Sequence, residues 1–440
     1  MPPTFVSQLF NSIADAGREL LDLRGGRKSS EDIKSYCRDL LTQKGEASGM
    51  ALARDVVVAW NELNDAEKLD FLAFLEAEMS PDQAKIETAV AAYHKEPTLD
   101  NYRTLSTVIE APRQELMRRI NFAPGGTAAI VAMRKFLLEN LKAHPELKAV
   151  DHDLKHLLSS WFNRGFLSLE RISWRTPAAV LEKLIEYEAV HEIDGWEDLR
   201  RRLDRDRRCF AFFHPALPDE PLIFVEVALV KGLAPAIPPL LSREGKRGDP
   251  AKADTAIFYS ISNCQDGLKG ISFGNFLIKQ VVAELSAELP NLKHFATLSP
   301  IPGFMRWLNS VNEATAGLHF RDIAKVREVL ADPEWHTKPE LAEKIREPLE
   351  QLCAHYLINE KSGRRPLDPV TRFHLGNGAR LEQLNWLGDT SPNGMQQSAG
   401  LLVNYYYSQK DIEKNHEAYA NEQRVVASSA LQALAKSARK

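Results

Sequence analysis

The sequence predicts an α+β protein, with an all-helical N-terminal domain followed by a mixed α/β domain. Residues 55–79 place apolar side chains at helical intervals, with charged residues between them. After about residue 205, short runs rich in Phe, Val and Ile replace this pattern, notably at 221–230 and 255–262. A glycine-containing loop then leads into an amphipathic helix over 277–289. Helices first, and strands alternating with helices afterwards, define the predicted class.

The two predicted domains cover residues 1–165 and 166–440. In the first, residues 125–144 indicate another helix, and we expect no strand before about residue 205. In the second, TPAAVLEKLIEYEAV and WEDLRRRLD predict two helices ahead of the strands. The arginine-rich stretch at 200–208 could meet phosphate, but a solvated helix face is the favoured interpretation.

Composition excludes several classes of protein. Hydrophobic residues make up 44% and charged residues 26% of the 440 residues, as in ordinary globular proteins. A net charge of −4 argues against general binding of nucleic acid. The four cysteines form no CxxC pair, which favours reduced structural thiols over a disulfide framework or a zinc site.

Targeting signals are also lacking in the pattern. No apolar run reaches the roughly 18 residues that a membrane span needs. The start lacks the basic head of a secretory signal, and the final residues, Ser-Ala-Arg-Lys, are not a peroxisomal Ser-Lys-Leu. We therefore expect no membrane partner and a cytoplasmic location.

The glycine-containing loop is a candidate ligand site. Gly267, Gly270 and Gly274 lie between a predicted strand and the start of a helix, where free N–H groups can bind an anion. The spacing matches no nucleotide fingerprint, so a phosphate seat and a plain turn both stay open. Residues 270–274 match the GxSxG of an α/β-hydrolase elbow, but NCQDGLK separates them from the strand that an elbow requires. A serine hydrolase is therefore disfavoured.

Ser299 ends a predicted short strand, HFATL, and stands before Pro300. The proline favours extended backbone at the serine, and Pro302-Gly303 predicts a rigid turn. A hydroxyl at the end of a strand in an α/β sheet lies where ligands usually bind. A serine that only bonds its own turn explains the pattern equally well.

His374 lies in VTRFHLGNGARL. If this segment is a strand, Phe373 and Leu375 share one face and His374 lies on the other, beside a glycine turn. Such a histidine can meet a ligand, although a surface or core role is the more common one. The run NYYY, which contains Tyr407, fits core aromatics or a dimer surface equally well.

Together, several separated motifs resemble the malonyl-CoA decarboxylase family. The motifs are APGGTAAIVAMR, TLSPIPGF, FHLGNG, LNWLGDTSPNG and NYYY, between about residues 110 and 407. The resemblance implies a helical N-terminal domain and a C-terminal domain similar to the acyl-CoA N-acyltransferases (GNAT-like). It also implies conversion of malonyl-CoA to acetyl-CoA and CO2, without a metal or an organic cofactor. A homo-oligomer, dimer or tetramer, with the helical domain mediating assembly, is expected.

The resemblance assigns site residues. The serine of TLSPIPGF maps onto Ser299 and the histidine of FHLGNG onto His374, as the catalytic pair. The family's thioester-binding loop maps onto Lys269, Gly270, Ile271, Ser272, Phe273, Gly274 and Asn275. Tyr407 is expected to contact substrate. Animal members carry a glutamate where this chain has Ser272, so a carboxylate role does not transfer to it. Two alternatives remain: an acyl-CoA-dependent acyltransferase on the same fold, and a malonyl-CoA-binding protein without activity.

Overall fold

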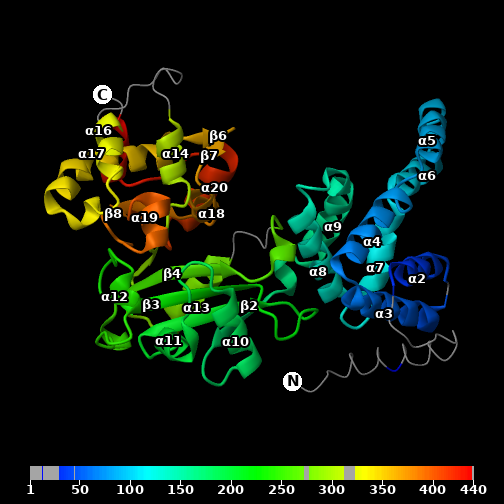
Figure 1. The fold of residues 1–440 in the computed structure, drawn as a ribbon, viewed down its shortest axis with the longest axis horizontal. Helices are drawn as coiled ribbons and strands as arrows, with labels where there is room; N and C mark the ends of the chain where they lie inside the picture. The colour runs from blue at the N-terminus through cyan, green and yellow to red at the C-terminus, as the bar shows by residue number, and fades with distance from the viewer. Residues whose placement is uncertain (1–11, 13–28, 44, 272–276, 312–322, 439–440) are drawn as a thin grey trace. The chain divides into compact units, whose positions relative to one another are not determined.

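The structure is a computed structural model that describes residues 12, 29–43, 45–271, 277–311 and 323–438. Its internal contacts divide the chain into two compact units (Figure 1). The helical unit comprises Met1–Leu167 together with Phe213–Glu220 and Gln265–Ser272. The sheet unit comprises Ser168–Phe212, Pro221–Cys264 and Phe273–Lys440. Each unit is described by itself.

The helical unit consists of short helices, of which α2, α4, α5 and α6 have side-chain caps at their N-termini. Asn64 caps α4 and Glu67 returns a bond to the backbone of Asn64, which satisfies two amides that a helix start leaves free. The α-helices are α2 (Ser30–Thr42), α3 (Glu46–Glu62), α4 (Asp65–Ala77), α5 (Gln83–Lys95), α6 (Leu99–Ile109), α7 (Pro112–Asn121), α8 (Gly126–Asn140) and α9 (Lys148–Trp161). Three 3-10 helices are η1 (Pro145–Leu147), η2 (Arg164–Phe166) and η4 (Asp266–Leu268).

Aromatic packing forms the core of the helical unit. The Trp60 ring on α3 lies 6.0 Å from Phe71 of α4 and 6.0 Å from Phe136 of α8. In contrast, α5 and α6 form a hairpin that extends from the other helices (Figure 1), and α6 buries none of its side chains. The hairpin exposes large apolar side chains: Leu99, Tyr102 and Ile109.

The sheet unit is built on a seven-stranded mixed sheet in the order β1-β2-β3-β4-β5-β9-β8. The strands are β1 (Ser168–Ile172), β2 (Arg207–Phe213), β3 (Ile223–Val230), β4 (Thr255–Asn263), β5 (His294–Thr297), β8 (Arg380–Asn385) and β9 (Leu402–Tyr406). A separate pair is formed by β6 (Lys361–Ser362) and β7 (Arg365–Pro366). The pair β4/β5 is parallel, whereas β2/β3, β3/β4, β5/β9 and β8/β9 are antiparallel.

Helices pack around this sheet. They are α10 (Ala178–Tyr187), α11 (Gly195–Arg202), α12 (Pro238–Leu241), α13 (Leu277–Glu288), α14 (Phe304–Ser310), α16 (Ile323–Leu330), α17 (Pro339–Asn359), α18 (Pro369–Gly376), α19 (Pro392–Ser398), α20 (Ile412–Glu422) and α21 (Ser429–Ser437). Two 3-10 helices are η3 (Pro250–Lys252) and η5 (Trp335–Thr337). Helices first, followed by a mixed α/β domain, confirm the predicted fold class.

The parallel strands β4 and β5 part after a short ladder. Their register runs from Thr255↔His294 to Phe258↔Thr297. Beyond this ladder, β4 continues beside β3 to Asn263, whereas Ser299 pairs with Val403 of β9. Because the two backbones no longer share bonds, the sheet opens at this point, and side chains from both arms face the opening.

The structure corrects two expectations about the segments before the sheet. A strand, β1, does occur before residue 205; it lies at the sheet edge and is mostly exposed, so it lacks the apolar alternation that predicts strands. The arginine-rich stretch is not a solvated face either. Arg201 and Arg202 are buried, and Arg202 pairs with the buried Glu226 of β3 at 2.7 Å. A partner distant in sequence decided this, which local pattern does not reveal.

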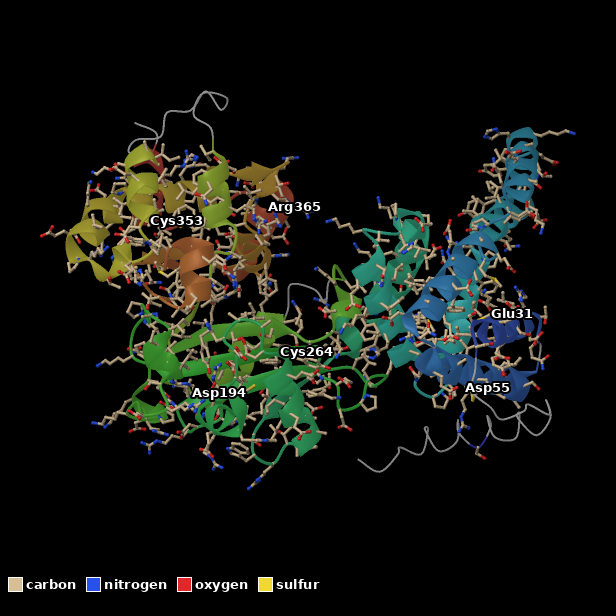
Figure 2. The ribbon with its side chains drawn as sticks, viewed as in Figure 1. Glu31, Asp55, Asp194, Cys264, Cys353 and Arg365 are labelled. Atoms are coloured by element: carbon tan, nitrogen blue, oxygen red, sulfur yellow. The ribbon has the colours of Figure 1, made fainter. Side chains whose placement is uncertain are left out.

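None of the four cysteines forms a disulfide and all four are buried, in agreement with the prediction of reduced structural thiols. Cys264 follows β4 and Cys353 lies on α17 (Figure 2), and burial raises the pKa of the Cys353 thiol. In the part of the chain that the structure describes, no helix is long and apolar enough to cross a membrane.

Candidate active site

A cavity of about 260 Å³ lies where β4 and β5 part. Residues 258–261 of β4 line one side, and residues 298–300 line the other. Pro369, Phe373 and His374 of α18 and Val190 from the turn before α11 complete the wall. Most of these side chains are apolar, with a few polar groups among them, as in typical small-molecule sites.

Ser299 is fixed at the mouth of this opening by its backbone. Its N–H donates to the carbonyl of Val403 at 2.9 Å, and its carbonyl accepts from the N–H of Val403 at 3.0 Å. The ladder cannot continue through Pro300, because proline has no N–H to donate. The Ser299 hydroxyl donates to Thr297 Oγ1 at 2.8 Å and lies in the cavity wall.

His374 lies on a helix, so the strand considered for this segment does not form. Asp368 caps α18 by accepting from Thr371 N–H at 2.7 Å, and Pro369 occupies the first helical position. This Asp-Pro start is a helix signal that the alternation of Phe373 and Leu375 obscured. The helix places His374 Nε2 3.2 Å from Ser299 Oγ, across 75 residues of sequence.

Two tyrosines of the NYYY run hold the imidazole from behind. Tyr407 Oη lies 2.8 Å from His374 Nδ1, and Tyr407 is 1% exposed. The ring of Tyr405 stacks on the imidazole, with centroids 4.4 Å apart. The Tyr405 hydroxyl is anchored in turn, 2.7 Å from Thr371 Oγ1. Tyr407 is not among the residues that line the cavity described above; its hydroxyl contacts the imidazole instead.

Burial sets the charge of the imidazole. It lowers the pKa of His374 to about 3, and burial likewise raises the pKa of Tyr407 well above its ordinary value. The ring and the phenol are therefore both neutral at pH 7. Any proton that His374 gives at pH 7 comes from a neutral imidazole N–H.

The polar side chains of the site carry more polar hydrogens than their hydrogen bonds to one another use. Thr297, Ser299, His374 and Tyr407 form a chain with three hydrogen bonds. Three hydroxyls and a neutral imidazole carry one polar hydrogen each, which is one more than three bonds use. Because the Ser299 hydroxyl donates to Thr297, the extra hydrogen of this chain belongs to the Thr297 hydroxyl. Its direction can reverse when a ligand supplies a new acceptor.

Thr297 and Tyr405 were not predicted from sequence. Thr297 stands two residues before Ser299, so in an extended chain both side chains share a face, and this period-two relation could have indicated Thr297. Thr297 Oγ1 also accepts from the N–H of Tyr405 at 3.2 Å. No local pattern distinguishes the ring of Tyr405 from its neighbours in the run.

The predicted thioester loop is described in part. Lys269, Gly270 and Ile271 belong to the helical unit by their contacts, whereas Ser272, Phe273, Gly274 and Asn275 lie outside the described residues. The loop is fastened to α8, since Arg134 Nη1 donates to the Gly267 carbonyl at 2.7 Å. A Cβ at Gly267 would come within 2.1 Å of the Val131 carbonyl oxygen, so only glycine fits there. The strand β4 ends at Asn263, well before Gly270, as the argument against a hydrolase elbow required.

Comparison with known proteins identifies the ancestry of this site. The malonyl-CoA decarboxylase C-terminal domain matches residues 165–440, and the N-terminal domain of the same family matches residues 79–162. The crystal structure of malonyl-CoA decarboxylase from Rhodopseudomonas palustris is 49% identical with a TM-score of 0.88, covering 92% of this chain and 99% of that chain. The corresponding structure from Agrobacterium vitis is 50% identical with a TM-score of 0.86, at 92% and 99% coverage.

An animal relative agrees with these structures. The mitochondrial malonyl-CoA decarboxylase of Anser anser anser is 40% identical over 338 residues, which cover 71% of this chain and 67% of the relative. The fold, the site and this ancestry define an enzyme of the carboxy-lyase class. More narrowly, the chain belongs to the malonyl-CoA decarboxylase family.

Proposed function

We propose that this chain converts malonyl-CoA to acetyl-CoA and CO2, and that Ser299 and His374 carry the reaction. The proposal rests on one observation: the Ser299 hydroxyl and His374 Nε2 lie 3.2 Å apart in the wall of a mostly apolar cavity. Ancestry supports the overall reaction, and the geometry supports these two residues as the reacting groups.

The chemistry needs a place for negative charge. When the bond between Cα and the carboxylate breaks, its electron pair passes to the thioester carbonyl and CO2 leaves. An enzyme accelerates this step by binding the resulting enolate more tightly than the substrate. Hydrogen-bond donors aimed at a developing oxyanion are a usual means, and losing one costs roughly 2.7–4 kcal/mol. The Ser299 O–H and the His374 Nε2–H are suitable donors in this cavity.

Proton transfer completes the reaction. The Cα of the enolate takes one proton to become the methyl group of acetyl-CoA, and each turnover therefore consumes one proton from solvent. Ser299 gives its O–H proton to Cα and is reprotonated from His374 Nε2–H, and the pair then regains a proton from water. A neutral imidazole can serve as such a donor, as it polarises a carbonyl in other enzymes. A covalent acyl-serine is not needed, because the thioester already accepts the electron pair.

The remaining assignments belong to the same proposal. Lys269 to Asn275 bind the thioester, and Tyr407 serves the substrate by fixing the imidazole rather than by contact. Residues 1–165 and 166–440 act as an assembly domain and a catalytic domain of a cytoplasmic homo-oligomer in fatty acid metabolism. The exposed apolar side chains of the α5–α6 hairpin support the assembly role, because an isolated pair of helices leaves them unpacked.

The test is CO2 release from malonyl-CoA alone, measured for the wild type, Ser299→Ala and the control Ser398→Ala. Ser398 is also buried, but its hydroxyl donates to the Leu401 carbonyl, away from the cavity. We expect rapid release from the wild type and the control and a large loss in Ser299→Ala. Acyl transfer that requires an added amine would indicate the acyltransferase alternative. Binding of malonyl-CoA without any release would indicate a sensor.

A further inference from the structure

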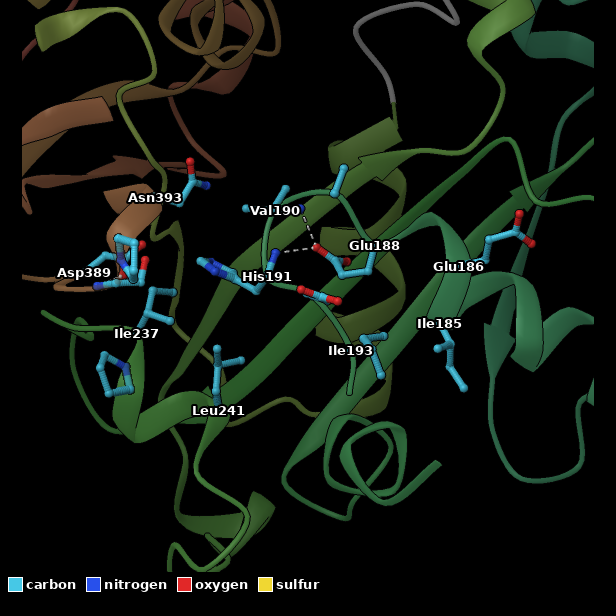
Figure 3. Close-up of a pocket in the computed structure, with 15 residues that line it drawn as sticks. Ile185, Glu186, Glu188, Val190, His191, Ile193, Ile237, Leu241, Asp389 and Asn393 are labelled. Atoms are coloured by element: carbon cyan, nitrogen blue, oxygen red, sulfur yellow. Dashed lines mark hydrogen bonds between the residues drawn. The ribbon is translucent and has the colours of Figure 1, made fainter. Parts of the chain in front are cut away.

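One residue lines both the candidate active site and a much larger cavity of the same unit. The larger cavity holds about 980 Å³ and lies between the turn before α11, α12 and the start of α19 (Figure 3). Among the described residues, Val190 alone lines both this cavity and the 260 Å³ site cavity. The two cavities therefore meet at Val190, which we refer to as the partition.

A buried carboxylate holds this partition in place. Glu188 Oε1 accepts from the N–H of Val190 and from the N–H of His191, each at 2.8 Å (Figure 3). The same carboxylate is fastened to β4, because Ser260 Oγ donates to it at 2.7 Å and Ser262 Oγ at 3.2 Å. Ser260 itself lines the site cavity. The turn is thus tied to the strand that forms the cavity wall, which restricts the movement of Val190.

The larger cavity suits an alkyl chain but not an anion. Its apolar wall includes Ile185, Ile193, Ile237 and Leu241 (Figure 3). Its charged lining is acidic, with Glu186, Glu188, Glu192 and Asp389, and no Lys or Arg is among its described lining residues. A malonyl carboxylate is repelled there. An uncharged substituent on the malonyl Cα is not.

We propose that Val190 determines the acyl specificity of this enzyme. It closes the site cavity against the larger one, so that an unbranched malonyl thioester fits and a 2-alkylmalonyl thioester does not. Glu188 is the positioning residue that fixes Val190. The inference rests on the proposed function, because it assigns the substrate range of the same site. A smaller side chain at position 190 joins the two cavities, and the alkyl group can then pack against the isoleucines of the larger one.

The experiment measures kcat/KM for malonyl-CoA, methylmalonyl-CoA and ethylmalonyl-CoA in the wild type, Val190→Ala and Val190→Ile. One methylene in an apolar pocket typically changes discrimination by roughly 10–200-fold. We expect Val190→Ala to raise the ethylmalonyl-to-malonyl ratio at least about ten-fold, and Val190→Ile to lower it. The matched control is Ile193→Ala, which enlarges only the larger cavity and leaves the ratio unchanged. Val190 is half-exposed, so both variants are expected to fold.

The positioning role of Glu188 has its own readout. Glu188→Met keeps the approximate size of the side chain but removes the oxygen that accepts from the backbone N–H groups of Val190 and His191. We expect the ethylmalonyl-to-malonyl ratio to rise, whereas a merely structural role would lower both kcat/KM values together. A wild type that turns over malonyl-CoA, combined with an unchanged ratio in Val190→Ala, overturns the inference alone. A wild type that releases no CO2 overturns the proposed function instead.

Discussion

The sheet unit buries two polar clusters. They differ in charge and in whether they contain a polar hydrogen that their own hydrogen bonds do not use. In the first, Arg202 donates to Glu226 at 2.7 Å, to Asp198, and to the carbonyl of His191 at 3.0 Å. In the second, the site chain, uncharged hydroxyls flank His374. The first joins α11 to β3 and to the turn of Val190; the second lines a cavity.

The contrast separates stability from reactivity. A buried ion pair is stable only while both partners remain, because a single buried charge without its partner is costly. Its groups bind each other, so it offers a ligand no proton to exchange. Burial raises the pKa of Glu226 to about 7 even with Arg202 beside it, so this carboxylate depends on its partner. The site chain carries no charge to compensate and one hydrogen more than its bonds use, which allows proton exchange with a ligand. Buried polar groups thus connect elements of the fold in one place and line a cavity in the other.

The largest expected effect comes from removing the imidazole. Without His374 the chain of hydroxyls cannot be reprotonated, so His374→Ala should lower kcat for CO2 release by roughly 10²–10⁴-fold, the usual contribution of acid–base catalysis. Acetyl-CoA binding, followed by calorimetry, should be largely retained. The control is His294→Ala: His294 Nδ1 lies 2.8 Å from Tyr406 Oη in an exposed version of the same pair. Turnover near wild type in His374→Ala would remove His374 from the reaction.

Breaking the ionic cluster should affect folding instead. Arg202→Met leaves Glu226 buried without its cation, and such a change typically destabilises by about 3–5 kcal/mol. Urea unfolding monitored by circular dichroism measures this loss. Arg200→Met is the control, because Arg200 on the same helix is exposed. Equal stability of the two variants would show that the buried pair does not hold α11 on the sheet.

Removing the Tyr407 hydroxyl, which binds His374 Nδ1, should lower turnover less than removing the imidazole. Tyr407→Phe keeps the ring but removes the hydroxyl bound to Nδ1, and leaving a buried polar atom unpaired costs about 1–3 kcal/mol. We expect kcat to fall about ten-fold or more, with KM little changed. Tyr406→Phe, on the exposed pair, should change neither constant. A KM increase at constant kcat in Tyr407→Phe would indicate direct contact with substrate instead.

The last expected effect, on stability in acid, is absent at neutral pH. The folded pKa of His374, about 3, lies below its ordinary value of 6.5, so the unfolded chain binds a proton between these pH values that the folded chain excludes. The free energy of unfolding therefore falls as the pH falls from 6.5 toward 3, by about 1.4 kcal/mol per pH unit. Above pH 6.5 this contribution does not change. Thermal unfolding of His374→Gln should show a flatter pH dependence than the wild type between these pH values.

Local pattern was informative where neighbouring residues decide the geometry. Pro300 restricts Ser299 to extended backbone whatever surrounds it, and the observed pairing with Val403 agrees. The helical stripe over 277–289 likewise became α13. Pattern failed at His374, because a period of two over a few residues occurs by chance in a short helix, and Asp368-Pro369 was the better signal. It also failed for the arginines at 201–202, whose partner Glu226 lies on another element.

The sequence by itself determined the order of a helical and a mixed α/β domain, the serine at a strand end, and the motifs of the family. Those features depend on side-chain size, backbone preference and neighbouring residues. Only the tertiary structure decided that β9 lies beside β5, which brings Tyr407 to His374 and His374 to Ser299. It also decided the neutral state of the imidazole and the position of Val190 between two cavities. Burial and long-range pairing cause these properties, and both arise only when distant segments pack together.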